Sequence, residues 1–457
     1  MALTPSQIQL LKSTLPLLET HGLTITTHFY TTMLTANPSL YSIFSKTNQV
    51  TLSQPRALAH ALHAYISNIS SLENLTAAVE LICHKHASLY IQPAQYKIVG
   101  TYLLQSMATV LGDNTFTDEI RDAWAAAYWQ LADMMIAREA KIYGTFGGWT
   151  DWHDFKVVRK VEESSVVTSF YLAPVDGEEG PLPRFVPGQY VSVQIEVPEL
   201  GCRQSRQYSL SDAANPEYYR ISVKRHDAAS ELESANRDQD QDRNQNRNHP
   251  GYVSTLLHSQ YHEGSILQLS HPTGDFLLPP SPPSSPTSTT TTTQPPLILI
   301  SAGVGLTPLL SMLNTLLPTP SQSPKSQSQS TPPPSTRPIH WIHTTHSTLT
   351  LPFLTHLHTL KSHYPNLRTT IFNTNPTEMD RVGRKYDFKG RMDLGMLVGE
   401  GGNKKDKDGR ELYLGDESAE YFVCGPEGFM RDVGGTLKTL GVRGKVRFEL
   451  FGTGGVE

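Results

Sequence analysis

The chain of 457 residues contains 38 Lys and Arg against 43 Asp and Glu, which gives a formal net charge of −5 at pH 7. This length exceeds one ordinary hydrophobic core, so several domains are expected. The mild charge argues against nucleic acid as a partner, and the lack of any apolar run of ~20 residues argues against an integral membrane segment. We expect a cytoplasmic protein and a monomer.

The cysteines and the first residues support the same expectation. Cys83, Cys202 and Cys424 are widely spaced, and this spacing is typical of neither a disulfide framework nor a CxxC metal site. The stretch MALTPSQIQLLKSTLPLLETHG lacks the basic and apolar blocks of a secretory signal, so we expect none. A reducing compartment follows from these features.

Three sequence patterns follow one another along the chain. Residues 4–143 show helical apolar spacing, and Thr4-Pro5 supplies an N-cap and a first-turn proline. Short β-like runs follow, namely FKVVRKV, VVTSFYL, YVSVQI, YYRISVKR and SILQLS. LILISAGVGLTPLLSMLNTLL then reads as strand, Gly-rich turn and helix, and IHWIHTT, RTTIFNT, YFVCG and VRFELF supply more strands. The predicted architecture is multidomain: an all-α domain at 1–147, an antiparallel β-barrel domain at 152–279 and an α/β domain at 295–457.

Low-complexity inserts interrupt these domains. They are rich in Asp, Asn and Gln, in Pro, Ser and Thr, or in Gly, Lys and Asp, and lie at 227–249, 280–296, 318–337 and 400–410. Such compositions bury too little apolar area to offset the entropy of ordering the chain. We expect disordered surface loops, with a role in phosphorylation or partner binding as the alternative.

The segment VELICHKHASLY contains two histidines that point to opposite sides of a helix. One apolar stripe at helical spacing includes His86 and leaves out His84. Its members are Val79, Ile82, Cys83, His86, Leu89 and Tyr90. The stripe predicts an inward His86 and an exposed His84, and a core histidine that is satisfied by its neighbours remains the alternative for His86.

Polar residues also occupy the apolar faces of other helices. Tyr30, Gln54 and Glu139 each share a face with core-type residues. A buried hydroxyl, amide or carboxylate costs about 1–3 kcal/mol unless a partner satisfies it. Together with His86, these groups from separate helices suggest a cofactor between them, although each could instead bond to backbone.

The segment CRQSRQYSLSD contains Arg206-Gln207-Tyr208-Ser209, which is the RxYS pattern of ferredoxin-reductase-type flavin domains. The arginine suits an anionic pyrophosphate, and the tyrosine and hydroxyl suit the flavin ring. PGQYVSV precedes this motif, and GYVSTLL follows it as a helix N-terminus able to bind phosphate. HPTGDF and VRFELFG complete the set.

LILISAGVGLTPLLSML predicts a phosphate-binding turn. Gly303 and Gly305 let the backbone approach a phosphate, Thr307 can cap the following helix, and Pro308 suits its first turn. The third glycine of GxGxxG is absent, but GVGLTP matches the GxGxTP form of flavin reductases. YFVCGPEGFM is the usual partner of this turn. Its Cys424 is interpreted as lining the nicotinamide site, with a merely buried small residue as the alternative.

These residues together resemble the flavohaemoglobins. His28-Phe29-Tyr30, Ile43-Phe44, Gln54, Leu58, Lys85-His86 and Tyr96 resemble their globin domain, and the remaining two-thirds of the chain agrees in order. The resemblance implies haem b with His86 as the proximal iron ligand, Phe44 on the porphyrin, and Tyr30, Gln54 and Leu58 in the distal pocket. It makes Tyr96 and Glu139 supports of His86, which favours oxygen chemistry over storage. Because of its inserts, we expect a eukaryotic, fungal-like member.

The resemblance also implies FAD and NADH or NADPH, and the sequence does not decide between the two nucleotides. The FAD residues it implies are Tyr190, Arg206, Gln207, Tyr208, Ser209, Gly251, Val253 and Ser254, and Phe451 covers the flavin unless it is simply core packing. The nucleotide residues it implies are Gly303, Val304, Gly305, Thr307, Pro308, Cys424, Gly425 and Pro426.

The activity that the resemblance implies is nitric oxide dioxygenation, in which NAD(P)H reduces FAD, FAD reduces haem, and NO and O₂ become nitrate. One alternative is an NAD(P)H-dependent reductase of peroxides, ferric ions or quinones. The other is an oxygen- or redox-sensing globin, which the complete flavin and nucleotide motifs disfavour because a sensor needs no hydride supply.

Overall fold

The structure is a computed structural model that describes residues 3–175, 181–226, 251–279, 294–319, 334–399, 402–403, 405 and 412–452. The predicted insert at 227–249 lies outside the described residues, as do most of 280–296, 318–337 and 400–410. The C-terminal end of the 318–337 insert differs from its prediction. Arg337 is buried, donates to the carbonyl of Pro295 and pairs with Glu420 at 2.6 Å, so this end is anchored to the α/β part.

The N-terminal part is helical, as predicted. Thr4 caps the first helix, because its hydroxyl accepts from the backbone N–H of Gln7 at 3.2 Å. Its principal helices are α1 (Pro5–Ser13), α2 (Leu15–Ala36), α3 (Lys46–Val50), α4 (Ser53–Ser67), α5 (Thr76–Ala87), α6 (Pro93–Leu111) and α7 (Asp118–Gly144). Its core side chains include Leu11, Ile25, Phe29, Met33 and Ile66.

The middle part is an antiparallel sheet with strand order β4-β3-β6-β1-β2-β5. A bridge between Leu210 and Ile221 joins the two outer strands, which closes the sheet in the barrel-like way that the sequence predicts. The strands are β1 (His153–Glu162), β2 (Val167–Pro174), β3 (Tyr190–Val197), β4 (Cys202–Ser209), β5 (Tyr219–Lys224) and β6 (Ile266–Leu269), and α9 (Tyr252–Gln260) precedes β6.

The C-terminal part is built on a parallel sheet with strand order β10-β9-β8-β7-β13-β14. Its central strands are buried along almost their whole length because helices cover both faces, although they include the polar residues Ser301, His340 and His343. The strands are β7 (Leu297–Ala302), β8 (Ile339–Thr345), β9 (Leu367–Asn373), β10 (Phe388–Lys389), β13 (Glu420–Gly425) and β14 (Lys445–Leu450), beside a small pair β11 (Val398–Gly399) and β12 (Gly402–Asn403). The helices α10 (Leu306–Leu316) and α11 (Leu354–His363) pack on one face, and α12 (Glu427–Thr439) packs on the other.

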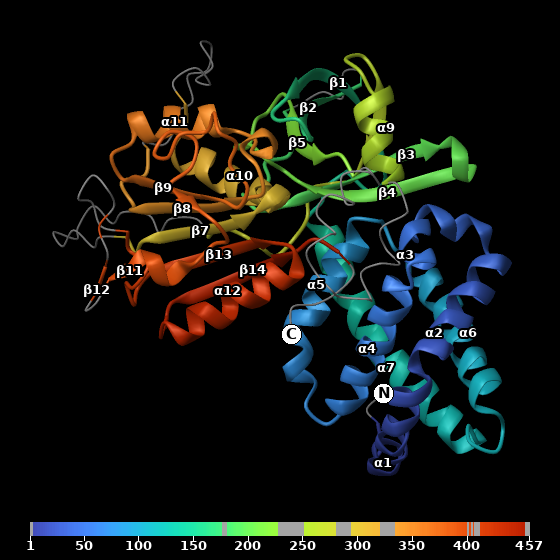
Figure 1. Ribbon diagram of the computed structural model, residues 1–457. Coiled ribbons are helices and arrows are strands. Elements are labelled where there is room, and N and C mark those ends of the chain that lie inside the picture. Colours follow the sequence, from blue (N-terminus) through green and yellow to red (C-terminus); the bar gives the residue numbers. More distant parts are fainter. Residues whose placement is uncertain are drawn as a thin grey trace, which may run out of the picture.

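The helical part lies against both sheets at the centre of the molecule, where α5 comes close to β14 (Figure 1). Gln204 on β4 joins it to the antiparallel sheet, because its amide donates to the carbonyl of Tyr41 and accepts from the backbone N–H of Lys46 at 3.1 Å. The hydroxyl of Tyr90 accepts from the backbone N–H of His271 at 3.0 Å. Directional bonds between residues far apart in sequence thus set how these parts meet.

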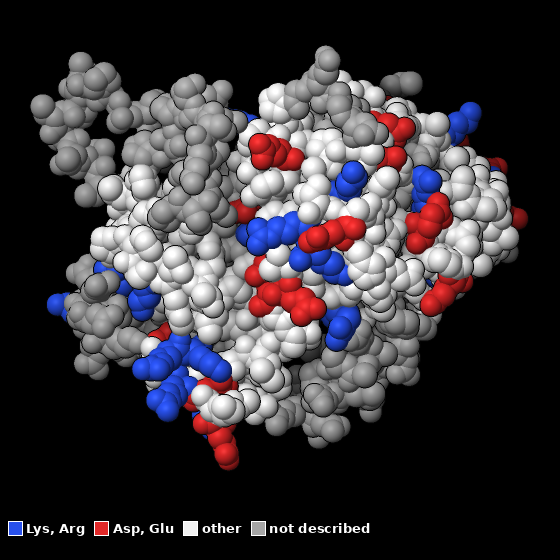
Figure 2. Space-filling model, turned by 90° about the horizontal axis from the view of Figure 1, so that it is seen from above, with Lys and Arg blue, Asp and Glu red and all other residues white. Residues whose placement is uncertain are grey.

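None of the described helices is both long and apolar enough to cross a bilayer. Figure 2 shows one face of the molecule, on which Lys and Arg side chains are intermingled with Asp and Glu side chains. This face therefore does not present the single-sign basic surface that nucleic-acid binding favours.

Candidate functional site

The imidazole of His86 on α5 is held by residues from the two following helices. Its Nδ1 lies 2.8 Å from Oε1 of Glu139 on α7 and 3.0 Å from the hydroxyl of Tyr96 on α6. The Tyr96 hydroxyl donates to the same carboxylate oxygen at 2.6 Å. Because an ionised carboxylate only accepts, this arrangement places the imidazole proton on Nδ1 and leaves a lone pair on Nε2.

This arrangement fits a haem iron ligand. Glu139 is 2% exposed. The pKa of Tyr96 is raised, chiefly because the hydroxyl is buried and secondly because it bonds to the Glu139 carboxylate, so the tyrosine keeps its proton. The His86 side chain remains 32% exposed, and its Nε2 bonds to nothing in the described part of the chain. Metal-ligating histidines commonly donate their other ring N–H to a carboxylate in this way. The structure therefore brings together the three residues predicted for this side.

Two of the residues predicted for the distal side, Tyr30 and Gln54, lie close to a shared neighbour, Gln49. Tyr30 on α2 is buried, and its hydroxyl makes no hydrogen bond to any described residue, while burial raises its pKa. The amide oxygen of Gln54 on α4 accepts from Nε2 of Gln49 at 2.6 Å, which orients the Gln54 amide. Tyr30 and Gln49 line one cavity of about 180 Å³. Gln49 was missed by the sequence reasoning, and its NQ neighbourhood carries no helical-face signal that would have identified it.

Apolar side chains that are only partly buried surround these groups. The ring of Phe44 packs edge-on to Tyr30 with centroids 5.5 Å apart. Ile43, Phe44 and Leu58 pack against the helical core without being fully buried. Partly exposed apolar side chains inside a helical domain suit the faces of a porphyrin.

His84 is mostly covered where the domains meet, so the prediction that it is exposed is wrong. Its side chain is 13% exposed, and its Nε2 lies 3.2 Å from Glu80. Its Nδ1 lies 2.7 Å from the hydroxyl of Thr273 and accepts from the backbone N–H of Gly274 at 3.2 Å. The helix face that carries His84 is polar because it docks on the HPTGDF loop and not because it faces solvent.

Two charged residues near this docking face make contacts that were not predicted, although Lys85 is one of the residues that carry the resemblance. The Lys85 ammonium donates to the carbonyl of Gly452 at 2.6 Å, which ties α5 to the residues that follow β14. Glu449 on β14 is 6% exposed, and burial together with the charge of Asp275 raises its pKa to about 8. The available sequence signal was the presence of Glu449, together with Arg447, between the apolar residues of VRFELF.

The predicted flavin residues gather at the start of β3 and the end of β4. Tyr190 pairs with Ser209 in register, and its buried hydroxyl has no hydrogen-bond partner within the described ranges. Burial lowers the pKa of Arg206, and among the described residues no carboxylate pairs with its guanidinium. Burial also raises the pKa of Tyr208. A guanidinium without a carboxylate partner among the described residues fits the pyrophosphate of FAD, and the unsatisfied Tyr190 hydroxyl offers a separate polar contact to the cofactor.

Other predicted flavin residues make contacts of a different kind. The amide of Gln207 donates to the hydroxyl of Ser88 at the end of α5, so this side chain contacts the helical part. Gly251 is the N-cap residue of α9, where Ser254 donates back to the Gly251 carbonyl at 3.0 Å. Val253 is buried in the core, so only its backbone can face a phosphate.

The turn between β7 and α10 has the geometry of a phosphate site. Gly303 has φ +55°, and a Cβ on Gly305 would lie 2.4 Å from the carbonyl oxygen of Cys424, so both positions require glycine. α10 has no side-chain cap, which leaves its first N–H groups for a phosphate. Thr307 does not supply the predicted cap, because its hydroxyl donates to the carbonyl of Val304 at 3.0 Å. Pro308 lies in the first turn, as predicted.

A groove of about 570 Å³ lies along the carboxyl ends of the parallel strands, where dinucleotides bind in sheets of this kind. Its lining includes Ala302, Thr344, Thr374, Arg391, Asp393, Pro426 and Asp432. Cys424 pairs with Glu449 in register and is fully buried, and burial raises its thiol pKa, so the sulfur is not a thiolate nucleophile. Gly425 and Pro426 follow it directly into α12. Phe451 is 43% exposed, which does not favour the core-packing alternative.

Comparisons with known proteins agree with this arrangement. The Globin family model matches residues 27–135, and the Oxidoreductase NAD-binding domain model matches residues 299–434. The flavohemoprotein of Bordetella pertussis is 41% identical over 99% of this chain and 100% of its own length, and that of Rhizobium meliloti is 39% identical over 98% of each chain. The crystal structure of flavohemoglobin from Malassezia yamatoensis with bound FAD and heme superposes with a TM-score of 0.74 at 25% identity, and the match covers 99% of this chain and 100% of that one. Both sequence relatives are bacterial, which does not support the expected fungal-like origin.

Proposed function

Because this chain belongs to the flavohaemoprotein family, we propose that it is a nitric oxide dioxygenase driven by NAD(P)H. Its cofactors are haem, FAD and a nicotinamide dinucleotide. When bound, FAD accepts the two electrons of a hydride and the haem iron accepts them singly. The observation that carries the proposal is the meeting of the helical site with both sheets at α5, through Lys85 and Gly452 on one side and His84 and Thr273 on the other.

In the nucleotide part, the residues bind and orient the nicotinamide dinucleotide and FAD. The unsatisfied N–H groups at the start of α10 hold phosphate, and the groove beyond it takes the remainder of the nucleotide. Arg206 binds the flavin pyrophosphate, and Tyr190 and Tyr208 lie along the ring. Cys424 and Glu449 border the place where the two rings meet, and both stay neutral near pH 7 because burial disfavours their charged forms.

In the helical part, one residue accepts the Nδ1 proton of His86 and another can donate a hydroxyl proton to dioxygen. Glu139 accepts the Nδ1 proton of His86, which raises the basicity of Nε2 toward iron. The Tyr30 hydroxyl keeps its proton because it is buried, so it can donate to dioxygen. Gln49 fixes the Gln54 oxygen, which leaves the amide N–H groups as further donors.

The decisive experiment begins with anaerobic addition of NADH or NADPH to the holoprotein while the flavin and Soret bands are monitored. O₂ and NO are then added, and nitrate is measured against nucleotide consumed. Each NO combines with one O₂ and one electron to give nitrate, so about two nitrates per hydride are expected. Low nitrate yield with fast reduction of peroxide, ferric ion or quinone would favour the reductase, and slow haem reduction by either nucleotide would favour the sensor.

A further inference from the structure

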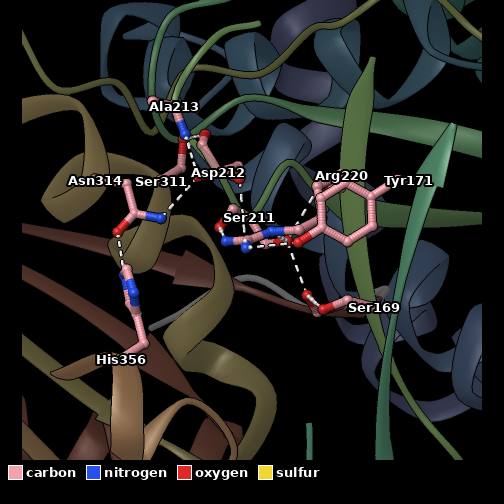
Figure 3. Close-up of polar contacts among 10 residues, drawn as sticks. Ser169, Tyr171, Ser211, Asp212, Ala213, Arg220, Ser311, Asn314 and His356 are labelled. Carbon is pink, nitrogen blue, oxygen red and sulfur yellow. Dashed lines mark hydrogen bonds and ion pairs between the residues drawn. The ribbon is translucent and has the colours of Figure 1, made fainter. Parts of the chain in front are cut away.

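A buried polar network joins the antiparallel sheet to α10, the helix that begins at the phosphate-binding turn (Figure 3). Asp212 lies at its centre, three residues beyond Ser209 of the flavin motif. Its backbone carbonyl accepts from the hydroxyl of Ser311 at 2.7 Å, and its Oδ1 accepts from Nδ2 of Asn314 at 2.8 Å. One residue of the flavin-binding part thus makes two hydrogen bonds to consecutive turns of the nucleotide-binding helix.

The carboxylate of Asp212 is itself held in place by Arg220 on β5. The guanidinium Nη1 lies 3.4 Å from Oδ2, and the two side chains are only 6% and 4% exposed. Arg220 also donates from Nε to the hydroxyl of Ser211 at 3.2 Å and from Nη2 to the carbonyl of Ser211. Its guanidinium lies over the ring of Phe353 at 5.3 Å from the centroid. Oδ1 of Asp212 also accepts from the backbone N–H of Ala213 at 2.9 Å, so the carboxylate is oriented with Oδ1 toward Asn314 and Oδ2 toward Arg220.

The amide of Asn314 is oriented from its other side as well. Its Oδ1 lies 2.7 Å from Nε2 of His356 on α11, and an amide oxygen only accepts, so the imidazole donates. The pKa of His356 is lowered to about 4, chiefly because the ring is buried and secondly because Arg220 carries a positive charge nearby. The ring is therefore neutral near pH 7. The Asn314 amide nitrogen consequently has to face Asp212.

Stability alone does not account for this network. Burying an ion pair has a desolvation cost that well-packed apolar side chains would avoid, so such a pair is weak evidence for a stabilising role. Directional bonds do provide a single relative placement of two surfaces that apolar packing would leave free to slide. Asn314 lies eight residues along the helix from Leu306, which is about 12 Å from its first turn. A shift of α10 at Asn314 is therefore carried to the phosphate-binding turn.

We propose that Asp212 is a positioning residue for hydride transfer: it locks α10 against the flavin-binding strand β4, so that the nicotinamide and flavin rings meet at reacting distance. Reacting atoms need to come within about 3–3.5 Å, and a misplacement of about 1 Å can slow the transfer by about 100-fold. The inference rests on the hydride step of the proposed function and is independent of nitric oxide. If NADH fails to reduce the flavin of the wild-type protein, the proposed function is refuted. If NADH does reduce it, the proposed function stands and the variants below test this inference separately.

The test is anaerobic stopped-flow reduction of the flavin by NADH in the full-length holoprotein, with Asn314→Ala and Asp212→Asn. We expect the limiting rate to fall about tenfold or more while the Kd for NADH changes less than about threefold, because the contacts lie away from the nucleotide. NADH deuterated at the transferred position should show a larger isotope effect in the variants. Electron transfer from flavin to haem, started by photoreduction, should keep its wild-type rate.

The matched control is Glu196→Gln, which breaks an exposed ion pair with Arg203 between β3 and β4 and should leave flavin reduction unchanged. If Asn314→Ala lowers Tm or FAD content without changing the limiting rate, the network is only structural and the inference is wrong. If both variants fail to fold, Ser311→Ala removes a single bond to the Asp212 carbonyl. A limiting rate within twofold of wild type for Ser311→Ala would then overturn the proposal, and a clear loss would support it.

Discussion

The carboxylate of Glu139 lies 2.8 Å from Nδ1 of His86 and accepts from Tyr96 as well. We expect Glu139→Gln to keep haem but to lower the basicity of His86, because a neutral amide is a weaker acceptor than a carboxylate. The Fe–His stretching frequency in resonance Raman spectra should fall, and NO turnover should drop about 10–100-fold. Glu19→Gln is the matched control, since Glu19 pairs with His63 at 3.3 Å on the surface. An unchanged stretching frequency in Glu139→Gln would contradict the assigned role.

Tyr30 has a buried hydroxyl that bonds to no described residue, and we expect it to stabilise dioxygen in the pocket. Tyr30→Phe should accelerate O₂ dissociation about tenfold or more, because a hydrogen bond to a charged or polarised acceptor contributes about 1.5–3 kcal/mol. Flavin reduction by NADH should not change. Tyr65→Phe is the control, because that hydroxyl already donates to the carbonyl of Ala127 at 2.9 Å. The idea fails if both variants release O₂ at the wild-type rate.

Glu449 makes stability depend on pH. Its folded-state pKa is raised from 4.5 to about 8, chiefly by burial and then by Asp275, while Lys85 opposes the shift. Tyr190 and Cys424 are the other titratable groups that this carboxylate influences. Between about pH 4.5 and 8 the folded state binds more protons here than the unfolded state, so this group makes the free energy of unfolding fall as pH rises.

We therefore expect the loss of Tm between pH 6 and pH 8 to be smaller in Glu449→Gln than in wild type, measured on the holoprotein by calorimetry. Glu427→Gln is the control, because that side chain is 59% exposed at the start of α12 and should leave the slope unchanged. An identical pH slope in all three proteins would show that Glu449 ionises normally.

His84 docks the helix that carries His86 on the loop containing Thr273 and Gly274. We expect His84→Ala to slow haem reduction by reduced flavin several-fold, because the two parts lose a pair of interdomain hydrogen bonds. Flavin reduction by NADH should stay at the wild-type rate. Both rates come from one anaerobic stopped-flow experiment followed at the flavin and Soret bands, and His63→Ala provides a surface control. Haem reduction at full speed in His84→Ala would exclude this coupling.

Much of the fold could be predicted because its signals are local. Helical spacing over 4–143, strand-like runs after it and the glycine turn at 303–305 each depend on neighbours within a few residues. The stripe that selected His86 over His84 has the same origin. Thr307 shows how far such signals reach: it is in the correct turn, yet its hydroxyl bonds to the carbonyl of Val304 and not to the helix N-terminus.

By itself, the sequence determined three domains in order, the apolar stripe on α5 that includes His86, and the flavin and nucleotide motifs, since periodicity and turn chemistry are written in adjacent residues. Only the tertiary structure decided that His84 bonds to Thr273, that Lys85 reaches Gly452 and that Asp212 holds Asn314. These pairs join residues about 100 to 370 positions apart. Their contacts arise from the way folded domains pack together, and no local pattern encodes that packing.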